Sequence, residues 1–208
     1  MVAHYPLGLS LAEYLSIEQE LVKSVTEPTL FTWIAPPTVI YGHHQIAENE
    51  LNAAYCRAHG IAVVQRKSGG GCVYADRGNL MISYISPSTN SESVFAHVLE
   101  KVAEALQSIG LPAVTTSHND ILIAGRKVSG WACFRAPTGT IVHGTMLFNV
   151  DIETMMAAIT PSSQKLTKHG VASVRQRVVN IREITDRFAS IEDLQSYVTE
   201  YLAARMDD

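Results

Sequence analysis

Three consecutive glycines follow a short run of β-type residues and stand directly beside two cationic side chains. The segment covers residues 66–71 and reads RKSGGG. Without Cβ atoms in the way, successive backbone N–H groups can converge on a phosphate or a carboxylate, and Arg66 and Lys67 add positive charge beside them. Glycine clusters are also ordinary turn punctuation, so the triplet alone is explained more simply by a flexible turn. An anion-binding loop needs support from the rest of the chain.

A lysine in an unusual setting is the second feature. Lys127 lies in a predicted strand within the segment 119–130, which reads NDILIAGRKVSG. Lysines in strands are usually solvated edge residues, because lysine is seldom buried without a partner. Further along, His143, Gly144 and Thr145 interrupt an alternating apolar run. Taken alone, His143 is explained by hydrogen bonding within a sheet.

The elements that must position these residues can be predicted from periodicity and turn signals. Helical spacing, caps and stop signals predict helices at about residues 10–25, 48–59, 92–108, 151–158 and 191–205. Strands are predicted at about residues 29–34, 38–41, 61–66, 72–74, 80–85, 120–124, 126–134 and 140–150. We expect the strands flanking the 75–79 turn to form a hairpin and the last three strands to form a meander. Hairpins with separate helices indicate an α+β fold.

The composition is that of an ordinary globular protein. The 208 residues suffice for one substantial core, and we expect a single domain over residues 1–208. The formal net charge of -4 argues against nonspecific binding to nucleic acid, which needs a basic surface. Three widely separated cysteines support neither a disulfide framework nor a zinc site. With no secretion signal and no apolar membrane span in the sequence, we expect a cytoplasmic protein.

Four ordered motifs resemble the lipoate-protein ligase A branch of the biotin/lipoate ligase family. They lie within residues 33–45, 66–80, 119–130 and 143–147, and the likeness runs from about residue 30 to residue 180. The alternating glycine and arginine pattern of the biotin-ligase loop is absent, which favours lipoate or octanoate over biotin. The resemblance implies a biotin/lipoate ligase-like catalytic domain, with mixed, largely antiparallel β-sheets flanked by α-helices.

The resemblance also implies a reaction. Lipoate or octanoate would be activated with ATP and Mg²⁺ to an acyl-adenylate, and the acyl group transferred to a lysine of a lipoyl domain. The acceptor would belong to a 2-oxoacid dehydrogenase complex or be the glycine cleavage H protein. Lys127 would be the catalytic residue that bridges the acyl carbonyl and the α-phosphate.

The binding residues are carried over position by position. Asp120 or Asn119 would orient Lys127, and Asp120 would hold Mg²⁺. The expected substrate- and nucleotide-binding residues are Arg66, Ser68, Gly69, Gly70, Gly71, Val73, Tyr74, Asn79, Asn119, Asp120, Ser129, Gly130, His143, Gly144 and Thr145.

The sequence departs from the family pattern at several positions. Gln65 replaces one of two arginines usual before the loop, and Ala75 stands where a histidine is common. Cys72 follows the glycines where a small residue is usual. Trp131 fills a normally small position, where we expect its bulk to shorten the acyl pocket or alter substrate choice. Near Asp208 the chain stops without the accessory domain of long ligases, so we expect a separate accessory subunit or a simpler reaction.

Two other functions fit the same fold. One is an octanoyl or lipoyl transferase that works through a cysteine thioester. Residues 110–118, where the cysteine-using relatives carry their nucleophile, contain no cysteine, although Cys72 and Cys133 lie near the site by sequence. The other is a binding subunit that captures lipoate or a lipoyl domain without turnover. In a ligase, the basic run from Lys165 to Arg177 is expected to steer an acidic lipoyl domain into place.

Overall fold

The computed structural model describes residues 1–3, 5, 8–117, 119–159 and 177–206. Its helices are α1 (Leu11–Ser24), α2 (Ala47–Glu50), α3 (Ala53–Ala58), α4 (Ser91–Gln107), α5 (Ile152–Ala158), the short 3-10 helix Ile181–Glu183 and α7 (Ile191–Ala203). Its strands are β1 (Thr29–Ile34), β2 (Thr38–Tyr41), β3 (Ala62–Gln65), β4 (Val73–Ala75), β5 (Asn79–Ser86), β6 (Ala113–Thr115), β7 (Asp120–Ile123), β8 (Arg126–Ala136) and β9 (Gly139–Leu147).

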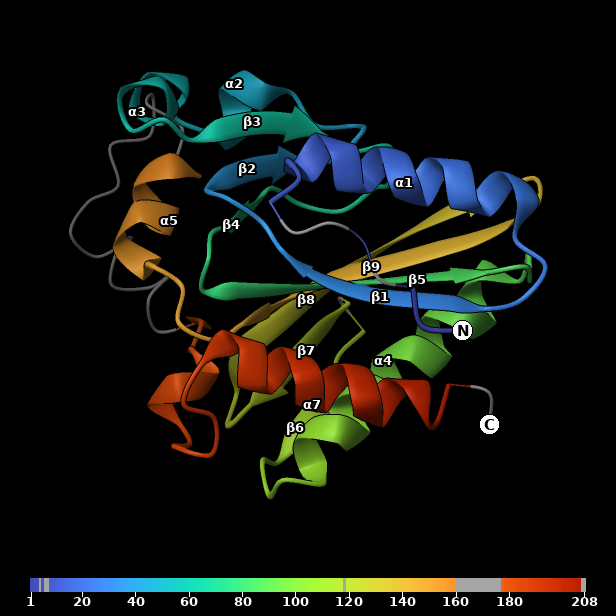
Figure 1. Ribbon diagram of the computed structural model, residues 1–208. Coiled ribbons are helices and arrows are strands. Elements are labelled where there is room, and N and C mark those ends of the chain that lie inside the picture. The colour runs from blue at the N-terminus through green and yellow to red at the C-terminus, as the bar shows by residue number, and fades with distance from the viewer. Residues whose placement is uncertain (4, 6–7, 118, 160–176, 207–208) are drawn as a thin grey trace.

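Two sheets carry the fold. The larger has six strands in the order β1-β5-β9-β8-β7-β6, and the smaller has three in the order β3-β2-β4. Every pairing in the larger sheet is antiparallel, whereas β2 pairs in parallel with β3 and antiparallel with β4. Helix α1 packs on one face of the larger sheet, and α4 and α7 cover the other (Figure 1). The predicted α+β class, with largely antiparallel sheets flanked by helices, is confirmed.

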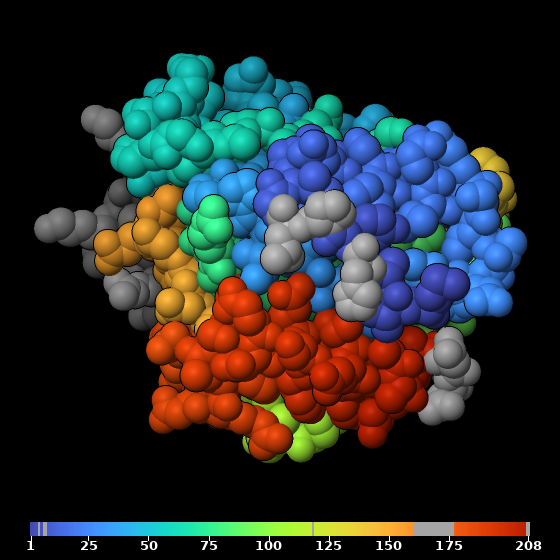
Figure 2. Space-filling view, in the orientation of Figure 1, coloured from blue at the N-terminus to red at the C-terminus, as the bar shows by residue number. Residues whose placement is uncertain are grey.

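Segments far apart in the sequence share the face of the molecule seen in the space-filling view (Figure 2). Figure 2 shows α7 forming the lower part of one face and the N-terminal third of the chain forming the upper part. Within the described ranges, no helix combines the length and the apolar character that crossing a bilayer requires.

The expected hairpin around the 75–79 turn does not form. Strand β4 pairs with β2 in the smaller sheet, while β5 lies between β1 and β9 in the larger one. The turn therefore carries the chain from one sheet to the other. Gly78 makes this crossing possible, because a Cβ there would lie 2.1 Å from the carbonyl oxygen of Asn149. That oxygen belongs to the main chain and cannot move aside as a side chain could.

Two further predictions need correction. The single helix expected near 48–59 is two short helices, separated at Leu51 and Asn52. Asn52 interrupts the helical pattern because its side chain accepts a hydrogen bond from the backbone N–H of Tyr55 and so caps α3. Strand β6 was not predicted, since its three residues follow Pro112 and are too few to show an alternating pattern.

The main hydrophobic core lies between the larger sheet and the helices α4 and α7. Apolar residues of α4 recur at helical spacing, and Val98, Val102 and Leu106 are fully buried there. A second cluster forms under α1, where Tyr14 stacks on Trp33 with ring centroids 4.1 Å apart. A third joins the smaller sheet to α3 and α5.

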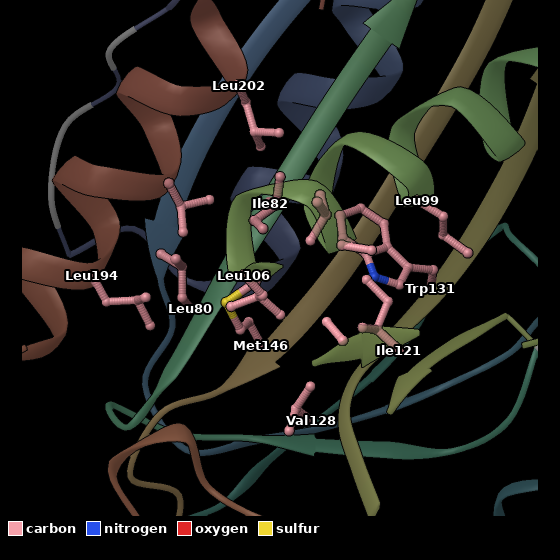
Figure 3. Packing of buried hydrophobic residues seen from close by; sticks show 14 of the residues in the cluster. Leu80, Ile82, Leu99, Leu106, Ile121, Val128, Trp131, Met146, Leu194 and Leu202 are labelled. Atoms are coloured by element: carbon pink, nitrogen blue, oxygen red, sulfur yellow. The ribbon is translucent and has the colours of Figure 1, made fainter. Parts of the chain in front are cut away.

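The Trp131 indole packs into the main core. Trp131 lies opposite Gly144 in the β8–β9 pairing, and Ile82 lies opposite Gly144 from the other side. Residues directly opposite one another share a face of an antiparallel sheet, so the indole occupies the α4 side together with Leu99 and Ile121 (Figure 3). The bulk of this side chain is directed into the hydrophobic core rather than toward Lys127.

Gly144 leaves the space that the indole fills. A Cβ at position 144 would lie 2.3 Å from the Trp131 ring. Gly144→Ala should therefore destabilise the fold by about 1–3 kcal/mol, a common cost of overpacking. In the double variant Gly144→Ala/Trp131→Leu, the smaller side chain removes the clash, so urea denaturation should give a loss smaller than the sum of the two single losses. Simple additivity would contradict the predicted contact.

Candidate active site

A β-bulge directs Lys127 toward Asp120. In the β7–β8 pairing, Asp120 lies opposite Gly130 and Leu122 lies opposite Lys127, with a register shift between Ile121 and Leu122. The shift leaves one extra residue on β8, so Lys127 and Gly130 share a face of the sheet although they are three positions apart. The Lys127 Nζ lies 2.7 Å from Asp120 Oδ1. A regular strand would place the amine on the opposite face.

Gly130 provides the space in which the lysine side chain lies. A Cβ at position 130 would approach the Lys127 Nζ to 2.7 Å and Cε to 2.8 Å. The Lys127 side chain remains 33% exposed, so its amine can meet a ligand from the cavity. The tight turn before it is formed by Ala124 and Gly125, which both have positive φ.

The glycine loop is held from inside by the Arg66 guanidinium. Arg66 is 6% exposed and donates hydrogen bonds to the carbonyl oxygens of Gly69 (2.8 and 3.1 Å), Gly71 (2.7 Å) and Ile40 (3.3 Å). Burial lowers the pKa of this guanidinium from its usual value, yet arginine stays protonated in proteins. No carboxylate pairs with it among the residues that the structure describes. Arg66 is thus a buried cation beside an open loop.

The loop backbone is arranged to donate hydrogen bonds outward. Its carbonyls at Gly69 and Gly71 face Arg66, and the N–H groups of Gly69, Gly70 and Gly71 have no acceptor among the described residues. Gly70 has φ +92, a conformation that favours glycine. Gly42 is equally constrained, because its Cβ would lie 2.4 Å from the Gly70 carbonyl oxygen. Free N–H groups next to a buried cation suit an anionic ligand.

A cavity of about 230 Å³ joins the two features. Of the residues singled out from the sequence, those that line it are Arg66, Gly70, Gly71, Val73, Asn119, Asp120, Lys127, Gly130, His143, Gly144 and Thr145. Its remaining wall is mostly apolar and is formed by Leu11, Leu15, Trp33, Ile40, Cys72, Met81, Trp131 and Ala132, together with Glu18. The lining therefore combines cationic and polar groups with a largely hydrophobic remainder.

Some expected site residues lie elsewhere. Ser68, Gly69, Tyr74, Asn79 and Ser129 are absent from the lining of this cavity. Ser129 lies on the other face of β8, fully buried, where its hydroxyl donates to the Thr145 carbonyl oxygen at 2.6 Å. Neighbours on a strand point to opposite faces, which explains why Ser129 and Gly130 separate.

Tyr74 and Asn79 are buried at the crossing between the sheets. The Asn79 Nδ2 donates to the Tyr74 carbonyl oxygen at 3.4 Å, and its Oδ1 has no hydrogen-bond partner in the described part of the chain. Burial, with a smaller contribution from Asp76, raises the pKa of the Tyr74 hydroxyl, which stays neutral. Both side chains support the walls of the site from behind.

A series of buried hydrogen bonds around Glu18, which the sequence interpretation missed, forms another part of the cavity wall. Glu18 is 1% exposed, and its Oε2 lies 2.8 Å from His143 Nδ1. His143 Nε2 lies 2.8 Å from the Ser68 hydroxyl, and Ser83 donates to Glu18 Oε1 at 2.6 Å. The Trp33 Nε1 donates to Ser83 at 3.0 Å. Glu18 was detectable, because it is an acid at the same helical spacing as the buried residues of α1.

The described residues offer limited support for a metal. No group of three or more histidine, cysteine, aspartate or glutamate side chains gathers among them. Of the two described carboxylates that line the cavity, Asp120 lies beside Lys127, and Glu18 is paired with His143. Such a site fits Mg²⁺, which is commonly bound through one or two carboxylates together with substrate phosphates.

A family model described as the lipoyl protein ligase A/B catalytic domain matches residues 10–203, nearly the whole length of the chain. The chain belongs to this family. Lipoate-protein ligase LplJ of Bacillus subtilis is 35% identical over 191 residues, which are 90% of this chain and 58% of that protein. This member of the lipoyl protein ligase family thus spans less than two thirds of that relative.

Solved structures agree with the family assignment. A bi-partite lipoate protein ligase from Thermoplasma acidophilum, described with its E2 lipoyl domain, is 26% identical with a TM-score of 0.85, and the match covers 93% of this chain and 78% of that one. A lipoate-protein ligase A bound with ATP is 25% identical with a TM-score of 0.80, over 93% and 79% of the two chains. The recognised family and its fold are confirmed.

The cysteines of this family member are poor nucleophiles. Burial raises the pKa of the Cys72 thiol to about 12 and that of Cys133 to about 11. At pH 8 the thiolate fraction of Cys72 should fall about a thousandfold below that of an unperturbed thiol, since each unit of pKa is a factor of ten. Because the folded pKa lies above the unfolded value of 9.0, burial stabilises the fold below about pH 9, and that contribution is lost as the pH rises toward 12.

Alkylation should report this difference. We expect iodoacetamide to modify Cys72 and Cys133 slowly in the folded chain at pH 8 and rapidly in urea, as followed by peptide mass. Equal rates for Cys72 with and without urea would contradict a half-buried, protonated thiol.

Proposed function

We propose that this chain is the catalytic part of a lipoate-protein ligase, which activates lipoate or octanoate with ATP and transfers the acyl group to a lysine of a lipoyl domain. The observation that carries the proposal is the Lys127 amine, fixed by Asp120 on a cavity that also contains Arg66 and the glycine loop. Family membership supports the same conclusion. A relative of this family with bound ATP supports the nucleotide.

Both half-reactions develop negative charge near one point. In the first, the acid's carboxylate oxygen bonds to the α-phosphorus of ATP and pyrophosphate leaves. In the second, the acceptor amine bonds to the acyl carbon, loses a proton, and AMP leaves. A cation placed between the acyl carbonyl and the α-phosphate lowers the barrier to each, because preorganised charge costs no reorganisation during the reaction. Lys127 has the charge and the exposure for this role.

The loop and Asp120 complete the polar end of the site. The free N–H groups of Gly70 and Gly71, with Arg66 behind them, would bind phosphate or carboxylate oxygens. Asp120 would hold Mg²⁺ together with the phosphates. A bound Mg²⁺ supplies further charge neutralisation to the phosphates.

The apolar wall of the cavity supports an aliphatic acid as substrate. Trp33, Ile40 and Met81 are among the apolar residues that line it. Each buried methylene contributes about 0.8 kcal/mol, so an eight-carbon chain gains substantial binding energy here. The cavity does not itself separate lipoate from octanoate.

The acceptor is proposed to be a lipoyl domain of a 2-oxoacid dehydrogenase complex or the glycine cleavage H protein. The Thermoplasma neighbour, described with an E2 lipoyl domain, supports the first, and its description as bi-partite supports a separate accessory subunit. The expected basic docking run from Lys165 to Arg177 falls almost entirely outside the described residues. We also propose a cytoplasmic location, which suits the three free cysteines.

Neither alternative function is favoured. A thioester transferase needs a reactive thiolate, and burial keeps Cys72 and Cys133 protonated. A subunit that only binds lipoate or a lipoyl domain, and catalyses no reaction, would not need a lysine amine that a carboxylate fixes in the cavity.

Lys127→Ala should lower lipoylation by at least about a hundredfold, because the charge that stabilises both transition states is lost. The measurement is the intact mass of an apo lipoyl domain incubated with enzyme, ATP, Mg²⁺ and lipoate, with an accessory subunit added if required. Lys101→Ala is the matched control, since Lys101 pairs with Glu104 on α4, away from the cavity. Wild-type rates in Lys127→Ala would refute the assignment. Product formed without ATP from an acyl-carrier donor would instead show a transferase.

Asp120→Asn should lower the rate about tenfold or more, because Lys127 loses its charged partner. A Mg²⁺ titration separates the two roles proposed for Asp120. If it holds the metal, half-saturation should move to higher Mg²⁺ in the variant; if it only positions the lysine, half-saturation should stay constant while the maximal rate falls. An unchanged rate at every Mg²⁺ concentration would remove both roles.

A further inference from the structure

Ser68, His143 and Glu18 form a hydrogen-bonded series of a hydroxyl, an imidazole and a carboxylate. The Ser68 Oγ lies 2.8 Å from His143 Nε2, and His143 Nδ1 lies 2.8 Å from Glu18 Oε2. The three residues come from the glycine loop, from β9 and from α1. This is the order of groups in which a carboxylate orients a histidine that activates a serine.

The environment of Glu18 determines which imidazole nitrogen carries the proton. Glu18 is 1% exposed, and its Oε1 accepts a hydrogen bond from the Ser83 hydroxyl at 2.6 Å. Its Oε2 then accepts from His143 Nδ1, since an ionised carboxylate only accepts. In the neutral imidazole this leaves a lone pair on Nε2, directed at the Ser68 hydroxyl. His143 is therefore oriented as a general base toward Ser68.

A second cavity, of about 340 Å³, reaches all three residues. It lies between α1 and the β3 region and shares Leu15, Glu18, Arg66 and His143 with the cavity of Lys127. Unlike that cavity, it is lined by Ser68. The side chain is only 2% exposed, so a ligand that reaches it must be small.

Two backbone N–H groups that follow Ser68 in the sequence are candidate donors to an oxyanion. The backbone N–H groups of Gly69 and Gly70 directly follow Ser68, and neither has an acceptor among the described residues. An N–H group immediately after a nucleophile is a frequent component of an oxyanion hole. The loop therefore supplies a nucleophile and free donors, and β9 supplies the base.

We propose that Ser68 is a nucleophile and that the chain hydrolyses small activated acyl esters at this second cavity. The Ser68 oxygen bonds to the ester's carbonyl carbon as its proton passes to His143 Nε2. The alcohol leaves with that proton when the ester C–O bond breaks, and a water molecule then repeats the sequence to release the acid and regenerate Ser68. Glu18 acts as a positioning residue through His143. The reaction uses neither ATP nor Lys127, so it stands independently of the proposed ligation.

The experiment uses two small probes without ATP or lipoate. Methanesulfonyl fluoride should sulfonylate Ser68, with loss of fluoride, as located by peptide mass. Hydrolysis of p-nitrophenyl acetate should fall at least about a hundredfold in Ser68→Ala. Ser93→Ala is the control, because Ser93 is exposed on α4. Absence of an adduct on Ser68, or equal hydrolysis by Ser68→Ala and the unaltered chain, would show that the series is only structural.

Two further variants distinguish a loss of catalysis from a loss of folding. Glu18→Gln should lower kcat for p-nitrophenyl acetate more than it raises KM, because the carboxylate orients the base without touching the ester. Ser68→Cys keeps the side chain small and nucleophilic, and should yield an acetyl thioester at position 68. A folded Ser68→Cys chain without that adduct would overturn the proposal even if Ser68→Ala does not fold.

Discussion

The buried guanidinium of Arg66 is the interaction on which the site depends most. It donates to three carbonyl oxygens from two segments, Ile40 on β2 and Gly69 and Gly71 in the loop. These bonds do more than fix a flexible turn, because they occupy the loop carbonyls while its N–H groups keep no acceptor among the described residues. The same group contributes a positive charge that no described carboxylate neutralises. The Arg66 side chain thus fixes the geometry of the loop and also provides the positive charge beside it.

The position of Lys127 depends on a β-bulge and on the space left by a glycine. The bulge in β8 changes which face the lysine occupies, and Gly130 leaves the volume for its methylenes. Asp120 contacts only the terminal amine of the lysine side chain. The Lys127 amine is therefore directed by backbone geometry first and by electrostatics second, which suits the role proposed for it, close to charge that develops on a bound ligand.

Much of this could be read from the sequence. The strands and α4 followed from regular periodicity, and the motif positions led to Lys127, Asp120 and the glycine loop. The sheet to which β4 belongs could not be predicted, because a short turn favours a hairpin unless distant contacts, here between Gly78 and Asn149, prevent it. Ser129 was carried over from the family motif, which does not reveal that its side chain lies on the other face of β8. Glu18 was overlooked although its position in an apolar stripe marked it.

The position of Trp131 has a consequence for evolution of the chain. At β8 and β9, Ala132 and His143 lie on the cavity face of the sheet, while the Trp131 indole packs into the hydrophobic interior on the other face. A change in side-chain volume in that interior shifts the strands that line the cavity, because close-packed interiors transmit strain rather than absorb it. The shape of the cavity can therefore change through substitutions on α4 that never touch a ligand bound in it.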